Sequence, residues 1–326
     1  MEFRFVILGA GSIAVKFADA VRRTKNCAVA AVASKSMSRA KAFAGKSGIP
    51  AFYDSYEEML RAEHPDCAYI ATTCDSHFAL SMLCIRYNVP VLCEKAMFDS
   101  GEQAEQFFLE ADRKGLFSME ALWSNYLPAV RTVREWIASG KIGSLACMDF
   151  EIGFAAPRER ENRYFNPALG GGAANDLSVY AFHLLPWVSG RRIESMQAAV
   201  VPAPSGVDET ETVLLRMSGG LPATVRSTLG CGVEERMVVY GSLGRIVVPK
   251  PHLAERAWII GNDGRETESF TDTETENGFT YEVAEVVKRI RNGETESPVV
   301  PHAATMQAAR CISRIHREMH RQTPAE

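Results

Sequence analysis

Two groups of polar side chains in this chain could move a proton or stabilise a charged oxygen. Glu94 and Lys95 follow the apolar run Val91-Leu92-Cys93, so we expect them at the carboxyl end of a strand, where open α/β sheets hold their ligands. The Lys95 ammonium group can bond a reacting oxygen or a cofactor ribose. Glu94 can orient a lysine or bond to backbone. The alternative for Lys95 is a solvated loop lysine.

The second group is Asp176, Tyr180 and His183. Their i, i+4, i+7 spacing puts all three on one face of a helix. The residues around them are apolar, and a polar stripe on an apolar helix must find partners or face a cleft. Two simpler roles stay open. Asp176 could cap its own helix, because it follows three glycines, and His183 could be a core histidine bonded to backbone.

A cofactor for such chemistry is indicated by the glycine-rich segment near the start of the chain. An apolar strand runs into Gly9-Ala10-Gly11-Ser12-Ile13-Ala14 and continues as a helix. Gly9 permits the tight turn, Gly11 lets the backbone approach a pyrophosphate, and Ala14 lets the helix pack on the strand. This is the pattern of a dinucleotide-binding turn, although glycine-rich turns also occur for purely structural reasons.

The residues after this turn favour NADP over NAD. Ser12 and Ile13 open a helix whose amides and positive dipole end point at the phosphates. The second strand ends in Ser34 and Lys35, with Arg39 close behind, and lacks the carboxylate that bonds the ribose of NAD. A serine and two cations can instead bind a 2′-phosphate. The alternative is that Lys35 and Arg39 are ordinary surface charges.

The first part of the chain predicts a Rossmann dinucleotide-binding domain over residues 1–122. Short apolar strands without alternation are separated by helices, which is typical of a mostly parallel sheet covered on both faces. Ser55 is the expected cap of one of these helices, with Glu58 as its capping-box partner. The expected strands cover residues 3–8, 27–33, 68–72, 89–93 and 116–119.

Residues 123–326 predict a second, α+β domain with a large, mostly antiparallel open sheet. Helices are expected over 128–139 and 173–188, and the segments from 193 to 270 read as strands with no helix between them. Asn262-Asp263-Gly264 predicts a hairpin turn. Two helices, over 280–291 and 303–320, close the chain. An open sheet face is a large surface to leave wet, so we expect a homodimer or homotetramer formed through it.

Composition excludes several other classes. A net charge of -4 gives no electrostatic case for nucleic acid or an anionic membrane, and no apolar run approaches the ~20 residues that span a bilayer. The eight cysteines form no C-x-x-C pair and read as reduced thiols of a cytoplasmic protein. His316 and His320 have metal-ligand spacing but no evident third ligand, so we expect no metal.

Several motifs together resemble the Gfo/Idh/MocA oxidoreductase family, whose members carry E-K-P after the fifth strand. The resemblance covers nearly the whole chain and is greatest to the branch of dimeric dihydrodiol dehydrogenases and NADP-dependent xylose dehydrogenases. The residues that carry it are Ile70-Ala71-Thr72, His77, Glu94-Lys95, Glu120-Ala121-Leu122-Trp123, Arg163-Tyr164-Phe165-Asn166-Pro167, and Gly170-Gly171-Gly172-Ala173 followed by Asp176 and Tyr180.

The resemblance implies an NADP-dependent oxidoreductase that acts on a hydroxyl or carbonyl carbon of a sugar, polyol or cyclic diol. It implies Lys95 and Tyr180 as catalytic residues, with Tyr180 exchanging the proton and Asp176 orienting substrate hydroxyls or Lys95. His183 is the second candidate for the proton step. The remaining residues would contact cofactor (Thr72, His77, Glu94) or substrate (Trp123, as an apolar wall, and Arg163).

Three positions depart from the family pattern. Ala96 replaces the motif proline, which would loosen the turn carrying Lys95 because proline fixes φ. Thr73-Cys74 replaces the usual Pro-Asn, and Asn125 stands where arginine is frequent. Ala96 is the best support for one alternative, a non-catalytic NADP-binding regulator of the same fold. The resemblance leaves a second alternative open, a lyase or epimerase that uses its bound nicotinamide only transiently.

Overall fold

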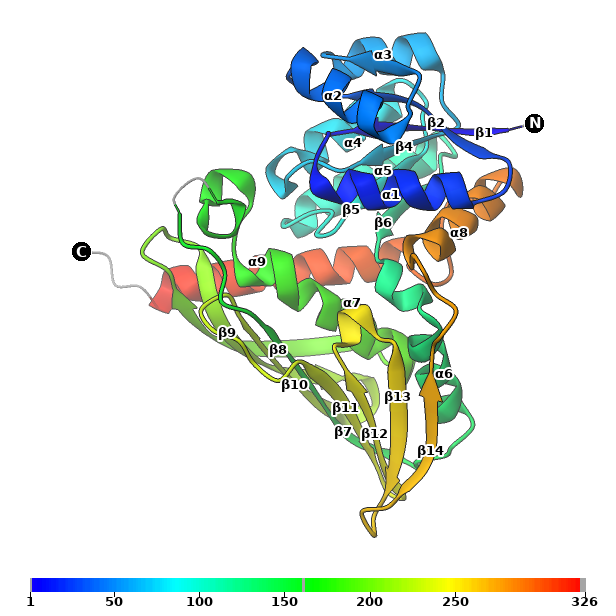
Figure 1. Ribbon diagram of the computed structural model, residues 1–326. Helices are drawn as coiled ribbons and strands as arrows, with labels where there is room; N and C mark the ends of the chain where they lie inside the picture. The colour runs from blue at the N-terminus through cyan, green and yellow to red at the C-terminus, as the bar shows by residue number, and fades with distance from the viewer. Residues whose placement is uncertain (1, 160–161, 323–326) are drawn as a thin grey trace. The chain divides into compact units, whose positions relative to one another are not determined.

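The computed structural model describes residues 2–159 and 162–322, which form two compact units (Figure 1). The first unit comprises the described residues of Met1–Trp123 and Glu276–Met306, and the second those of Ser124–Thr275 and Gln307–Glu326. The segment 276–306, which the sequence analysis grouped with the second domain, thus packs in the same unit as the Rossmann strands. The chain passes between the units three times.

A six-stranded parallel sheet forms the centre of the first unit. Its order is β3-β2-β1-β4-β5-β6, and every pair of neighbours is parallel. The chain winds outward from β1 in both directions, which puts the topological switch point at the carboxyl ends of β1 and β4. The strands are β1 (Phe3–Leu8), β2 (Cys27–Ala33), β3 (Ala51–Tyr53), β4 (Cys67–Ile70), β5 (Val91–Glu94) and β6 (Ser118–Ala121).

Three helices of this unit begin at a serine that caps the N-terminus. Ser36, Ser55 and Ser100 each accept the amide of the residue three positions further on, so the expected Ser55 cap is confirmed. The last helix of the unit packs on the first although more than 250 residues separate them. The helices are α1 (Ser12–Arg23), α2 (Met37–Ser47), α3 (Tyr56–Glu63), α4 (His77–Arg86), α5 (Gly101–Arg113) and α8 (Phe279–Arg291).

An eight-stranded sheet forms the second unit, in the order β14-β13-β12-β11-β7-β10-β9-β8. All neighbours are antiparallel except β7 and β10, so the mostly antiparallel sheet is confirmed. The strands are β7 (Leu145–Gly153), β8 (Ile193–Pro202), β9 (Asp208–Met217), β10 (Leu221–Thr228), β11 (Arg236–Gly241), β12 (Gly244–Pro249), β13 (Arg256–Gly261) and β14 (Glu266–Thr271).

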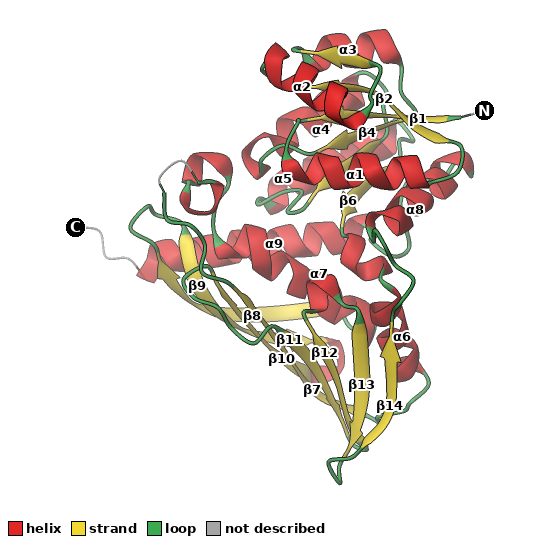
Figure 2. Ribbon diagram, viewed as in Figure 1, coloured by secondary structure: helices red, strands yellow, loops and turns green. Residues whose placement is uncertain are grey.

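One face of this sheet is covered and the other is open. Side chains alternate between buried and exposed along β9 and β10, as expected for a sheet with one solvated face. Three helices, α6 (Pro128–Ala138), α7 (Val179–Ser189) and the later part of α9 (His302–Gln322), lie on the covered side (Figure 2). The expected hairpin at 262–264 joins β13 to β14.

The helix expected over 173–188 departs from regular α geometry. Its first part, Ala174–Ser178, is a π-helix, and α7 follows directly. The prediction of one continuous α-helix there is therefore wrong. The wider π turn changes the face on which Asp176 lies relative to Tyr180, and π segments occur frequently at functional sites. Across the described residues, no helix combines the length and apolar character needed to cross a membrane.

Candidate active site

The glycine-rich turn has space for a ligand at the switch point. Gly9 has φ +106°, and a Cβ there would lie 2.8 Å from the carbonyl oxygen of Ala71, so this position requires glycine. A Cβ at Gly11 would have the same oxygen as its closest neighbour, at 3.7 Å, which is an ordinary contact. The packing of the chain therefore leaves room at Gly11, and the absence of a side chain there suits the close approach of a pyrophosphate.

The loop after β2 carries two exposed cations. Ser34 is buried, whereas Lys35 and Arg39 are exposed. Arg39 lies in the first turn of α2, and its amide donates to Ser36 Oγ at 3.4 Å. The loop and the α2 N-terminus thus offer hydroxyls, amides and two positive charges to an anion.

Glu94 fixes the end of β5 through two hydrogen bonds. The Tyr69 hydroxyl donates to Glu94 Oε1, and the Lys95 amide donates to Oε2 at 3.3 Å. Burial raises the pKa of Glu94, while the Tyr69 bond and the Lys95 charge lower it in part. Glu94 therefore supports the backbone of Lys95, in line with the backbone-bonding alternative.

The turn after Lys95 is held by side chains from neighbouring segments. The Ala96 carbonyl oxygen lies 2.9 Å from His77 Nδ1 and accepts from Cys74 Sγ at 3.3 Å. The Met97 amide donates to Glu120 Oε1 at 2.9 Å. The second ring nitrogen of His77 lies 3.1 Å from the Thr72 carbonyl. The structure thus places the His77 ring between two backbone carbonyls, and the expected loosening at Ala96 is countered by these bonds.

A second buried carboxyl group lies in the same region. Glu282, on α8, is fully buried and makes no hydrogen bond within the described residues. Burial and the neighbouring Glu94 raise the pKa of Glu282 well above its ordinary value.

Trp123 stacks on Phe279 in the same unit, with ring centroids 5.1 Å apart and planes at 22°. This contact gives Trp123 an apolar neighbour, as a wall residue would have.

In the second unit the structure pairs two of the expected substrate residues. Arg163 Nη2 donates to Asp176 Oδ1 at 3.0 Å, and the guanidinium lies 4.2 Å from the centre of the Tyr164 ring. Tyr180 is 8% exposed, with its ring centroid 5.3 Å from that of His252. His183 is buried in α7. Part of the irregular stretch 157–163, residues 160–161, lies outside the described residues.

The π-helix is supported by acidic residues that the sequence analysis missed. Asp208 Oδ2 accepts the Ala174 amide at 2.5 Å, so Asp208 rather than Asp176 binds the amide at the start of this segment. Glu211 accepts from Ser178, whose hydroxyl is 2.6 Å from that of Ser227. The sequence does indicate the burial of Glu211. Glu211, Val213 and Leu215 occupy alternate positions of one strand and therefore share a face, and that face is buried.

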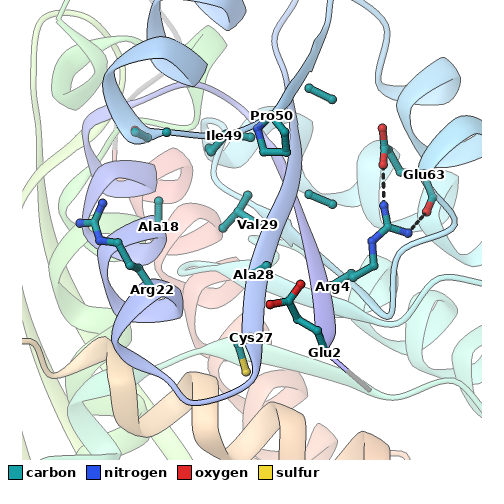
Figure 3. A pocket seen from close by; sticks show the side chains of 14 residues that line it. Glu2, Arg4, Ala18, Arg22, Cys27, Ala28, Val29, Ile49, Pro50 and Glu63 are labelled. Atoms are coloured by element: carbon teal, nitrogen blue, oxygen red, sulfur yellow. Dashed lines mark hydrogen bonds and ion pairs between the residues drawn. The ribbon is translucent and has the colours of Figure 1, made fainter.

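The first unit also has a pocket at the end of the parallel sheet opposite the glycine-rich turn. It has a volume of about 580 Å³ and is lined by the beginnings of β1 and β2, among them Arg4 and Val29 (Figure 3). Arg4 donates there to the Glu63 carbonyl and carboxylate at 2.8 and 2.7 Å. The glycine-rich turn follows the other end of β1, so this pocket is not the predicted cofactor site. Among the described residues no group of three or more potential ligands could hold a metal ion.

Comparisons with known proteins agree with the two-part architecture. A model described as "Oxidoreductase family, NAD-binding Rossmann fold" matches residues 3–121, and one described as "GFO/IDH/MocA C-terminal domain" matches residues 130–247. Bovine (Bos taurus) trans-1,2-dihydrobenzene-1,2-diol dehydrogenase is 31% identical over 311 residues, covering 92% of each chain.

Two solved structures share the fold. A 3-ketoreductase from Actinomadura kijaniata, in complex with NADP and TDP-benzene, has a TM-score of 0.87 and 20% identity, covering 97% of this chain and 98% of its own. A levoglucosan dehydrogenase in complex with NADH and levoglucosan has a TM-score of 0.89 and 16% identity, covering 99% and 98%.

Proposed function

The chain belongs to the GFO/IDH/MocA family of oxidoreductases, and on that basis we propose that it is an NADP-dependent dehydrogenase or reductase of sugars, polyols or cyclic diols. The observation that carries the proposal is the bonded turn at Lys95. It follows β5 at the same edge of the parallel sheet as the glycine-rich turn, and four side chains contact its backbone or that of its neighbours.

The cofactor assignment rests on fit and on charge. Gly11 leaves open the space that a pyrophosphate requires, and Ser12 and Ile13 begin a helix with no side chain bonded at its N-cap. Ser34, Lys35 and Arg39 suit a 2′-phosphate better than a 2′-hydroxyl. Of the two related structures, one was solved with NADP and the other with NADH, so NADP over NAD is our inference from these three residues.

Hydride transfer requires a held substrate, a proton acceptor and stabilisation of the oxygen. The bound nicotinamide supplies the hydride acceptor or donor. In the oxidation direction, the carbinol carbon would give up its hydride, and Tyr180, acting as its phenolate, would take the hydroxyl proton and become a neutral phenol. The Lys95 ammonium group stabilises the oxygen as negative charge develops, and the carbonyl product forms as the C–O double bond closes. In reduction the same groups act in reverse.

The remaining residues orient the substrate in this proposal. Asp176, held by Arg163, accepts hydrogen bonds from substrate hydroxyls, and Trp123 presents an apolar surface. His183 is kept as the second candidate for the proton step. A diol or sugar substrate is suggested by the names of the bovine relative and of the levoglucosan dehydrogenase. Thr72 and His77 support the cofactor edge through the backbone contacts described above.

We also propose that the protein works in the cytoplasm as a homodimer or homotetramer. All eight cysteines are free thiols, as a reducing compartment requires. The open face of the second sheet carries apolar side chains, including Leu214 at 50% and Val201 at 60% exposure, which a second copy could cover. Sedimentation at micromolar concentration tests this, and a monomer alone would contradict it.

The experiment that tests the function is a fluorescence titration with NADPH and NADH, followed by turnover with a sugar and diol panel. A change in reduced-nicotinamide absorbance that matches product formation supports a net oxidoreductase. Product without net absorbance change would identify the lyase or epimerase alternative. Binding without turnover of any substrate would favour the regulator.

A further inference from the structure

The peptide group that joins Ala96 to Met97 is held by side chains from three other segments. The carbonyl oxygen of Ala96 contacts a ring nitrogen of His77 on α4 and accepts from Cys74, which lies just before α4. The next amide, that of Met97, donates to Glu120 on β6. Ala96 itself is 1% exposed. The residue that precedes it is Lys95, so the position of Lys95 depends on these contacts.

The neutral ring of His77 can donate to only one of the two carbonyl oxygens that it contacts. Its two ring nitrogens face the carbonyl oxygens of Ala96 and Thr72, at 2.9 and 3.1 Å. A carbonyl only accepts, and a neutral imidazole has a single N–H. Burial lowers the pKa of His77, which favours the neutral ring. A neutral His77 therefore donates to one of the two carbonyls and cannot satisfy both.

Cys74 supplies a donor at the carbonyl that both side chains share. Its Sγ lies 3.3 Å from the Ala96 oxygen. Burial raises the pKa of this thiol well above its ordinary value, so Cys74 keeps the proton that it donates. A proline at position 96 would fix φ through its ring. Alanine has no ring to fix φ, and in this protein the Ala96 carbonyl oxygen instead accepts a hydrogen bond from the Cys74 side chain.

We infer that Cys74 is a positioning residue for Lys95: its thiol donates to the Ala96 carbonyl, whichever carbonyl His77 donates to, and restrains the turn that a proline ring would otherwise restrain. The inference rests on the proposed role of Lys95 in the reaction. It also assigns a purpose to two departures from the family motif, Cys74 and Ala96, which lie in contact with each other.

The test is a double-mutant cycle with a conservative rescue. Cys74→Ala should lower kcat about fivefold, which corresponds to about 1 kcal/mol, and leave the NADPH Kd within about twofold. Cys74→Ser keeps a donor and should retain most of the activity. In an Ala96→Pro background the loss from Cys74→Ala should be clearly smaller. Equal losses in both backgrounds, or unchanged kcat in Cys74→Ala, would overturn the inference. Cys147→Ala, on β7, is the matched control.

Hydrogen exchange separates this inference from the proposed function. Amides over residues 93–98 should exchange faster in Cys74→Ala than in Cys74→Ser, whatever Lys95 does in the reaction. If Lys95→Ala retains full turnover, the proposed function fails while the exchange result still decides the positioning role. Identical exchange in the two Cys74 variants would contradict that role even if Lys95 proves essential.

Discussion

Arg163 and Asp176 form an ion pair with 3.0 Å between Nη2 and Oδ1. Each was expected separately to contact substrate, and the structure joins them. Gly171 packs against the backbone of Arg163 and Tyr164. A Cβ at Gly171 would lie 2.6 Å from the carbonyl oxygens of both residues. The glycine thus permits the close packing that brings the Arg163 loop against the π-helix that carries Asp176.

Removing the guanidinium should release Asp176 from its held orientation. We expect Arg163→Ala to lower kcat/KM roughly tenfold, because a charge-assisted hydrogen bond that orients the carboxylate is lost. Arg158→Ala is the matched control, since Arg158 lies in the same stretch but pairs with Glu209. Steady-state kinetics of both variants measures the effect. Equal losses of kcat/KM in the two variants would mean that the Arg163–Asp176 ion pair has no specific role.

The buried Glu282 should make stability depend on pH. Its raised pKa means that above pH ~4.5 the unfolded chain releases a proton that the folded chain keeps, so stability falls as pH rises, by at most about 1.4 kcal/mol per pH unit, until the folded pKa is reached. Glu282→Gln removes this dependence. The unfolding free energy of the variant relative to the parent should therefore increase between pH 5 and pH 8 in denaturant titrations.

The control for that measurement is Glu105→Gln, at an exposed position of α5. It should show no comparable trend with pH. A relative stability of Glu282→Gln that stays constant from pH 5 to pH 8, or that falls, would show that Glu282 is ionised in the folded protein.

Cofactor choice should depend on the charge at position 35. Lys35→Asp places a carboxylate where we propose a 2′-phosphate, so the NADPH Kd should rise roughly 50-fold while that of NADH changes only a few-fold. The effect of Lys35→Asp on the NADPH Kd should become smaller at high salt, because Lys35 is exposed and salt screens its interaction with a phosphate. Lys41→Asp, at an exposed position of α2, controls for net charge. Equal weakening of NADPH and NADH binding would argue against the 2′-phosphate contact.

Many strand and helix positions in the first unit followed from local pattern, because its short apolar strands are bounded by turn residues and three of its helices, α2, α3 and α5, begin at a serine cap. The expected strand 27–33 matches β2 to the residue. The grouping of α8 with the Rossmann strands could not be predicted in this way. It depends on contacts with α1, such as Asn277 Nδ2 to the Lys16 carbonyl at 3.0 Å, between residues 261 positions apart.

The candidate site was only partly predictable for a related reason. Residue types and spacing identify Lys95 and Asp176, but spacing assumes α geometry and does not reveal the π turn at Ala174–Ser178. The bonds that hold the Lys95 turn join His77, Cys74 and Glu120, which approach one another only once β4, β5 and β6 are aligned in the sheet. Helical spacing does place Glu282 on the buried face of α8, three residues after Phe279 and four before Val286.

The catalytic assignment is tested most directly by two substitutions that remove one functional group each. Lys95→Ala should lower kcat about 100-fold or more, because the charge that stabilises the reacting oxygen is lost. Tyr180→Phe removes a single hydroxyl from a buried ring, so the fold should persist while proton exchange slows by a similar factor. NADPH should still bind both variants with a Kd within about threefold of the parent. Tyr240→Phe, on β11, controls for loss of a tyrosine hydroxyl. Because binding and turnover are measured on the same samples, near-normal turnover in both variants would refute the assignment, whereas loss of NADPH binding alone would place the two residues in cofactor binding instead.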